Sequence, residues 1–157
     1  TDKSVKLFEK FGIFTKAELE SRAEVLYETY AKTINIEALT MIDMASKQII
    51  PAVVKYTKSL ADTVIAVREA GADASAQTEI LKAVSEKLSA MKSALGKLEE
   101  VESKAGTIGN AKEQAFYYKD AVKVAMDALR APADEAEMLV DKKVWPLPTY
   151  GDLIFEV

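Results

Sequence analysis

Hydrophobic residues recur every three or four positions over most of the chain, which is the period of one face of an α-helix. A capping signature precedes the first stripe, because Thr15 lies three residues before Glu18 and both side chains can bond backbone amides at a helix start. Gly71 ends the stripe. We expect a helix over about residues 15–70 that kinks or splits at Pro51, since proline removes a backbone donor and crowds the preceding turn. The stripe consists of Tyr27, Ala31, Ile34, Ala38, Met41, Ala45, Ile49, Ala52, Tyr56 and Leu60.

Two further stripes predict helices over about residues 74–104 and 110–144. The first has the strict spacing of a coiled-coil seam and is flanked by charged residues, so we expect the hairpin over about residues 71–110 to project from the body or to pack through a narrow stripe. The seam could close on the other helices of this chain or on another chain. It consists of Leu81, Val84, Leu88, Met91, Leu95 and Leu98.

These stripes predict an all-α fold: an elongated antiparallel bundle of three long helices, or four if the first breaks at Pro51. The bundle covers residues 15–144. Residues 1–14 form a lead-in segment. Residues 145–157 form an extended tail, because Pro146 and Pro148 prevent a helix there.

Composition removes most catalytic chemistry from consideration. The 157 residues include no His and no Cys, which excludes catalytic triads, thiolate nucleophiles, Cys/His metal sites and disulfides. The net charge is −4, with acidic and basic residues interleaved, so no nucleic-acid surface is expected. No apolar run could span a membrane, and we expect a cytoplasmic location. We assign no catalytic, cofactor-binding or metal-binding residue in this chain.

Three polar residues are candidates for burial. Glu37 and Gln48 lie within about 40° of the centre of the first stripe by the helical count of about 100° per residue. An unpaired buried carboxylate is costly, so we predict a structural pairing of Glu37 with Arg130 or with a lysine of the third helix. The alternatives are that such a residue marks the edge of the stripe or contacts a ligand.

Both ends of the chain carry large apolar side chains outside the bundle. They either fold back over the bundle or dock on another domain or subunit. The candidates for docking are Phe8, Phe11 and Phe14 at one end and Trp145, Leu147, Tyr150, Ile154 and Phe155 at the other.

Several strings together resemble the C-terminal region of type III glutamine synthetases. They are Glu20-Ser-Arg-Ala-Glu24, Glu28-x-Tyr30-x-Lys32, Ile36-Glu-Ala-Leu-Thr-Met41, Pro51-Ala, Leu129-Arg130-x-x-Ala133-Asp134 and Trp145-Pro-Leu-Pro-Thr-Tyr150. Their order spans most of the chain, whereas residues 71–110 match only as generic helix.

The resemblance implies a parent enzyme that joins ammonia to glutamate using ATP and magnesium, in nitrogen assimilation and glutamine biosynthesis, and that assembles as stacked hexameric rings. The family's catalytic residues would lie upstream of Thr1. We therefore expect an excised accessory domain, inactive alone, that docks on the upstream catalytic domain and shapes a homo-oligomer. The alternative is a stand-alone helical adaptor whose seam binds a partner helix.

Overall fold

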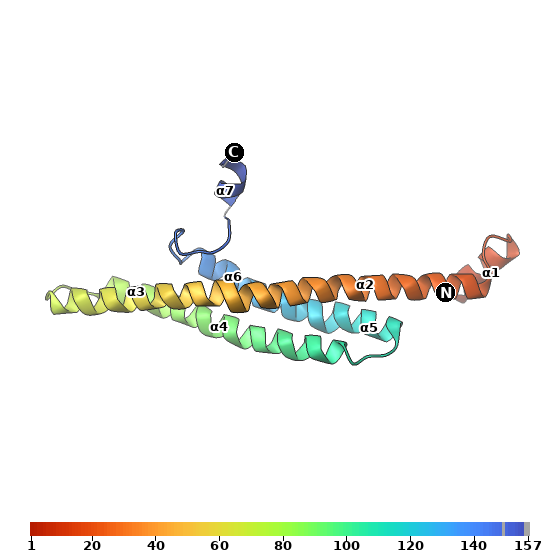
Figure 1. Cartoon of the computed structure of the whole chain (residues 1–157), viewed down its shortest axis with the longest axis horizontal. Helices are drawn as coiled ribbons and strands as arrows, with labels where there is room; N and C mark the ends of the chain where they lie inside the picture. Colours follow the sequence, from red (N-terminus) through yellow and green to blue (C-terminus); the bar gives the residue numbers. More distant parts are fainter. Residues whose placement is uncertain (149, 156–157) are drawn as a thin grey trace.

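The protein is described by a computed structural model that covers residues 1–148 and 150–155 and has helices but no strands within those ranges (Figure 1). The predicted all-α class is therefore confirmed. The helical elements are α1 (Asp2–Lys10), α2 (Lys16–Met44), η1 (Ala45–Ile49), α3 (Ile50–Glu69), α4 (Ser75–Ala105), α5 (Ala111–Tyr117), η2 (Tyr118–Val122), α6 (Lys123–Glu137) and α7 (Tyr150–Phe155).

The first long rod runs through α2, η1 and α3 (Figure 1). Its start is the predicted capping box: the Thr15 hydroxyl accepts from the Glu18 amide, and the Glu18 carboxylate accepts from the Thr15 amide. At the predicted kink the structure has a π-helical turn, η1, in which the Ile50 amide bonds to the Ala45 carbonyl. Such a wider turn relieves the crowding of the Pro51 ring against the preceding backbone, so helix continues on both sides.

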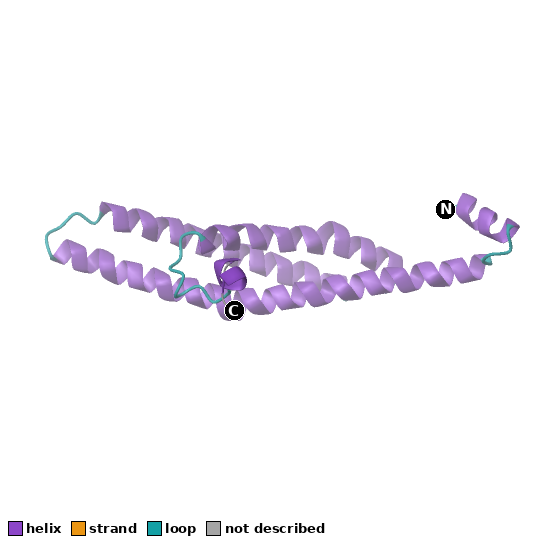
Figure 2. Cartoon of the chain, turned by 90° about the horizontal axis from the view of Figure 1, so that it is seen from above, coloured by secondary structure: helices purple, strands orange, loops and turns teal. Residues whose placement is uncertain are grey.

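The rod folds back on itself at Gly71, where a positive φ of 76° suits glycine. The returning helix α4 packs against α3 and α6, and α5 packs against α2. Seen from above, α3 and α4 form a hairpin joined by one loop (Figure 2), and the tip of this hairpin extends past the end of α6 (Figure 1).

The last helix of the bundle ends earlier than predicted, at Glu137 rather than near residue 144. The amides of Leu139 and Val140 both bond to the carbonyl of Ala136, at 3.0 and 2.9 Å. The Asp141 carboxylate then accepts from the Lys143 amide at 2.7 Å. The bond from Leu139 spans only three residues and tightens the last turn, and the bond to Asp141 then turns the chain away from the helix axis.

The core of the bundle joins small residues of α2 to large residues of α4 and α6. Ala31, Ile34 and Ala38 of α2 are buried, which lets the helices approach closely. The predicted α4 seam therefore closes within this chain: Val84, Met91, Leu95 and Leu98 are buried, and Leu81 and Leu88 are partly buried.

An ion pair between α4 and α6 lies at the edge of the core. The ammonium group of Lys87 on α4 pairs with the carboxylate of Glu135 on α6. The hydrogen bond that Lys87 donates to the Glu135 carboxylate raises the pKa of Lys87 above its ordinary value. This contact fixes α4 relative to α6 beyond the apolar packing.

Both ends contain more helix than predicted. The lead-in includes α1, whose first turn is capped by the Thr1 hydroxyl accepting from the Ser4 amide at 3.3 Å. The tail is non-helical over residues 145–148 but helical from Tyr150 to Phe155. The prediction of a wholly extended tail was wrong, because Pro146 and Pro148 prevent helix around themselves and place no restriction on residues further along.

Candidate interaction surfaces

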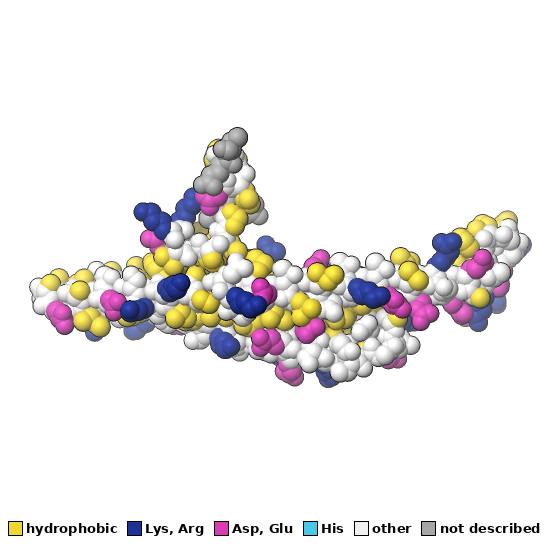
Figure 3. Space-filling view, in the orientation of Figure 1, with side chains coloured by type: hydrophobic (Ala, Val, Ile, Leu, Met, Phe, Trp, Pro, Cys, Tyr) yellow, Lys and Arg dark blue, Asp and Glu magenta, His cyan; other side chains and the backbone are white. Residues whose placement is uncertain are grey.

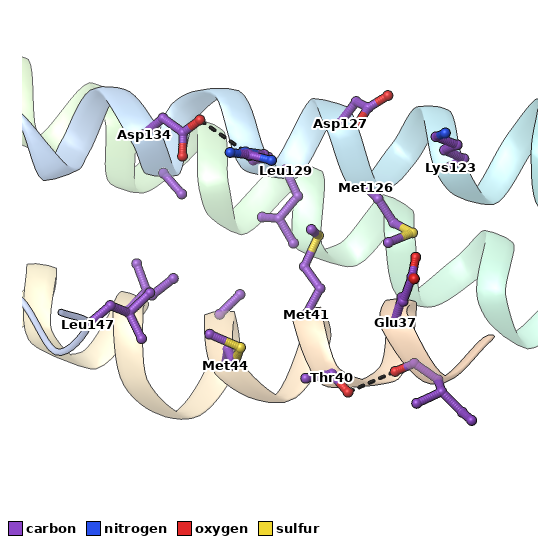
Figure 4. Close-up of a pocket in the computed structure, with 15 residues that line it drawn as sticks. Glu37, Thr40, Met41, Met44, Lys123, Met126, Asp127, Leu129, Asp134 and Leu147 are labelled. Carbon is purple, nitrogen blue, oxygen red and sulfur yellow. Dashed lines mark hydrogen bonds and ion pairs between the residues drawn. The ribbon is translucent and has the colours of Figure 1, made fainter. Parts of the chain in front are cut away.

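A groove of about 660 Å³ lies between α2 and α6, with Leu147 of the tail at one end. Its lining is largely apolar and includes three methionines, Met41, Met44 and Met126. Figure 4 shows Glu37 of α2 and Met126 of α6 pointing toward one another across it. Flexible thioether side chains of this kind suit adaptable contact surfaces.

The predicted burial of polar residues was wrong, since Glu37, Gln48 and Arg130 are all exposed. The helices α2 and α6 stand apart along the groove, so Glu37 faces an open space instead of a packed core. Arg130 pairs with Asp134 on its own helix, at 3.2 Å from Nε to the carboxylate. Gln48 faces a second hollow, between the η1–α3 junction and the tail.

Sequence reasoning did not select Met44 and Met126 as lining residues. The available signal was weak: Met44 lies three residues after Met41, which already belonged to the predicted stripe. Nothing in the sequence indicated that α6 would be separated from α2 near these residues. This separation creates the groove that the methionines line.

The tail is anchored to the bundle by its first apolar residue. Trp145 is 8% exposed and belongs to the core cluster, and Leu147 packs against that cluster. The Trp145 amide bonds to the Asp141 carbonyl at 3.0 Å. Further along the tail, Asp152 of α7 pairs with Lys142, which precedes the two prolines. Part of the tail thus folds back over the bundle, as one of the two sequence interpretations expected.

The remaining predicted docking residues are partly or largely exposed. Phe11 is 67% exposed and Phe155 81% exposed, with Ile154 at 65%. Phe8 and Phe14 are half-buried against each other, with ring centroids 5.9 Å apart, and the guanidinium of Arg22 lies 4.6 Å from the centroid of the Phe14 ring. The side chain of Tyr150 lies outside the described residues. Docking by these ends stays a prediction.

The described residues contain neither a cluster of metal-binding side chains nor a helix of membrane-spanning character. In residues 1–148 and 150–155, no group of three or more His, Cys, Asp or Glu side chains is placed to hold a metal ion. Over the same ranges, no helix is both long and apolar enough to cross a bilayer. Within the part of the chain that the structure describes, Tyr118 is a strongly buried ionisable group, and burial and the nearby charge of Glu102 raise its pKa. It lies in the core and lines no cavity described above.

Comparison with known proteins identifies the relatives. A family model described as the glutamine synthetase C-terminal domain matches residues 1–68. A glutamine synthetase of Butyrivibrio fibrisolvens is 39% identical over 159 residues, covering 100% of this chain and 23% of that protein. A glutamine synthetase of Bacteroides fragilis (strain YCH46) is 31% identical over 149 residues, covering 91% of this chain and 20% of that protein.

A third relative carries the type III designation. The type-3 glutamine synthetase of Dictyostelium discoideum is 29% identical over 161 residues, covering 99% of this chain and 22% of that protein. This chain therefore spans between 20% and 23% of the length of these relatives. The resemblance seen in the sequence is confirmed: residues 1–68 match the glutamine synthetase C-terminal domain family, and the relatives that match most of this chain are glutamine synthetases.

Proposed function

We propose that this chain is a structural, oligomer-shaping region of a larger ATP-dependent enzyme that ligates ammonia to glutamate. The observation that carries the proposal is the full-length match of this chain to 23% of a glutamine synthetase. In this proposal α2–α3, α4 and α5–α6 act as three long antiparallel rods of an accessory bundle. The chain works in the cytoplasm as part of a homo-oligomer, without nucleic-acid or membrane partners.

The chemistry of the parent enzyme lies outside this chain. ATP and magnesium would be bound by the upstream catalytic domain, because the described residues present no cluster of metal-binding side chains and the sequence has no His. In this proposal no catalytic step passes through the residues of this chain. Incubating this chain with ATP, magnesium, glutamate and ammonia should yield no glutamine above background.

The two ends are the surfaces that would dock on the catalytic domain. Both leave large apolar side chains in solvent, including Phe11 and Phe155. Neighbouring exposed apolar side chains, such as Leu153, Ile154 and Phe155 of α7, are typical of binding sites. Trp145 and Leu147 hold the start of the tail on the bundle, so α7 is presented from a fixed base. A bundle with an anchored tail and free apolar ends suits a connector between domains.

The test of docking uses the full-length synthetase that carries this region. Replacing Phe11 and Phe155 together by Ser should reduce the assembled oligomer and its glutamine synthesis at least severalfold, because desolvation of aromatic anchors dominates such contacts. The matched control is Met138→Ser, which removes a side chain that is 84% exposed and lies outside both ends. Unchanged assembly and activity in the double variant would refute the docking role.

The structure argues against the alternative of a stand-alone adaptor, because the α4 seam that would bind the partner is buried within this chain. That interpretation required the α4 seam to bind a helix of another protein. Val84, Met91, Leu95 and Leu98 are instead covered by helices of this chain, so no partner helix can use them without unfolding the bundle.

A further inference from the structure

The outer face of α2 carries a second regular pattern, opposite in direction to the core. Four residues step by four, three and four positions, as in a coiled-coil seam: Lys32, Ile36, Leu39 and Asp43. Ile36 is 67% exposed and Leu39 49% exposed. Glu28 pairs with Lys32 at 3.1 Å, and Asp43 pairs with Lys47 one turn further on. We call Glu28, Lys32, Ile36, Leu39, Asp43 and Lys47 the outer seam.

The bundle does not bury the outer seam, although Ile36 also lines the groove between α2 and α6. The buried residues of α2 are Ala31, Ile34 and Ala38, on the side where α4, α5 and α6 pack. Along the face shown in Figure 3, Lys or Arg and Asp or Glu side chains alternate with apolar ones over the α2 rod. Apolar residues flanked by paired charges at this spacing are the composition of a helix–helix interface.

The threonine hydroxyl groups beside the outer seam already donate their hydrogen bonds within the helix. The hydroxyl groups of Thr29, Thr33 and Thr40 donate to the carbonyls of Val25, Thr29 and Ile36, at 2.7, 2.9 and 2.8 Å. Covering this face would therefore leave none of these donors unpaired, and the desolvation cost of burying them is small.

The order of charges along the outer seam selects its partner. From Glu28 to Lys47 the signs run negative, positive, negative, positive, and the apolar pair Ile36 and Leu39 lies at the centre. A parallel copy of the same helix would place like charges side by side. An antiparallel copy, with its two-fold axis between Glu37 and Ala38, places every charge opposite its complement.

We propose that the outer seam pairs antiparallel with the outer seam of a second copy of this chain. Ile36 packs on the partner's Leu39, Lys32 faces the partner's Asp43, and Glu28 faces the partner's Lys47. Each contact occurs twice, as in any isologous interface. The overlap of Glu28 to Lys47 extends over about 30 Å of helix at 1.5 Å per residue, enough for several turns of contact.

This pairing rests on the oligomer-shaping role proposed above and names its contact. Two copies joined through α2 place their bundles on opposite sides of the two-fold axis. Because the outer seam is separate from Phe11 and Phe155, self-pairing and docking on the catalytic domain can occur in the same assembly and can be tested separately.

The first experiment measures the native mass of this chain against concentration by sedimentation equilibrium. We expect a monomer–dimer equilibrium. Lys32→Glu and Asp43→Lys should each raise the dimer dissociation constant about tenfold or more, since each places like charges opposite one another twice. The double variant Lys32→Glu with Asp43→Lys should return to within about threefold of the parent chain. Lys112→Glu, the same charge change on α5, should have no effect.

The second experiment fixes the orientation by cross-linking. Because the chain has no Cys, Glu28→Cys and Lys47→Cys each introduce a single thiol. Under mild oxidation, a mixture of the two variants should form mixed disulfide dimers. Each variant alone should not, because its two thiols would lie about 28 Å apart along the paired helices.

The outcomes separate this pairing from the proposed function. A chain that stays monomeric at all concentrations, a charge-swapped double variant that fails to dimerise again, or Glu28→Cys cross-linking to itself would each overturn the pairing. If the dimer forms but the Phe11 and Phe155 variant leaves the full-length synthetase assembled and active, the docking role fails and the pairing stands. If the Phe11 and Phe155 variant disrupts the full-length synthetase but this chain does not dimerise through the outer seam, only the pairing is overturned.

Discussion

The central bundle and the two ends of the chain use the same kinds of apolar residue in opposite ways. In the bundle, Leu95 and Leu98 are 1% and 0% exposed. At the ends, Phe11 and Phe155 are 67% and 81% exposed. The bundle therefore completes its own core, while the ends leave apolar surface for another protein surface to cover. Stability and assembly are carried by different parts of the molecule.

The same division recurs across the width of α2. Its inner face carries small residues, such as Ala31 and Ala38, that let α4 and α5 pack closely. Its outer face carries Ile36 and Leu39 between paired charges. The inner face packs within this fold. The outer face is the one that we propose pairs with a second copy of the chain. Substitutions can separate the two.

The largest expected effect is on the core of the bundle. Leu98→Ala should lower the free energy of unfolding by about 2–5 kcal/mol, because it removes a fully buried side chain and leaves a cavity. Leu153→Ala, the matched change in α7 where the side chain is 68% exposed, should change it by less than about 0.5 kcal/mol. Urea denaturation followed by circular dichroism measures both. Equal losses would contradict the division between bundle and ends.

A smaller effect should follow from enlarging the inner face of α2. Ala38 is 0% exposed, so Ala38→Leu forces extra methylene groups into a filled interface, at a cost of about 1–3 kcal/mol. The control is Ala128→Leu on α6, where the alanine is exposed. Both variants are compared by urea denaturation below the concentration at which the chain self-associates. If Ala38→Leu is neutral, the close approach of the helices does not depend on small residues.

The helices of the bundle could be predicted because their stripes are long and regular. Thr15 and Glu18 gave the start of the first helix, and Gly71 its end, from local chemistry alone. The end of the last helix was missed. It depends on Asp141, whose carboxylate holds the turn before the tail, and an aspartate there carries no distinctive sequence signal. The π-turn before Pro51 was also missed, since backbone adjustments of this kind follow from packing rather than from pattern.

The candidate surfaces were harder to predict than the helices. Glu37 and Gln48 lie near the first stripe in projection, but the groove beside α6 keeps them in solvent. A helical projection assumes that neighbours close over the whole face, and it contains no information on where they stand apart. The outer seam could have been found from the charge pairs at Glu28, Lys32, Asp43 and Lys47, which are regular in sequence. The first stripe had already predicted that Ala31, Ile34 and Ala38 face the core, so these charge pairs could have been assigned to another face of the same helix.

The smallest effect concerns the junction between α1 and the bundle, and it depends on pH. The Thr15 amide donates to the Glu18 carboxylate at 2.8 Å, and the Thr15 hydroxyl donates to it at 2.9 Å. These bonds, the backbone one first, hold the pKa of Glu18 below its ordinary value of about 4.5. A carboxyl whose pKa is lowered on folding stabilises the folded state above its ordinary pKa. That contribution is lost as the pH falls through the lowered value.

Glu18→Gln should therefore flatten the acid side of the stability profile. Between pH 7 and pH values below about 4.5, the unaltered chain should lose more stability than this variant in urea denaturation. Glu24→Gln removes the same charge from α2 away from the cap, and it should leave the acid slope as it is. At pH 7, Thr15→Ala should cost about 1 kcal/mol, the usual value of a lost N-cap. A Glu18→Gln profile parallel to that of the unaltered chain would mean that the cap does not hold the start of α2, and that the bundle tolerates fraying next to its N-terminal end.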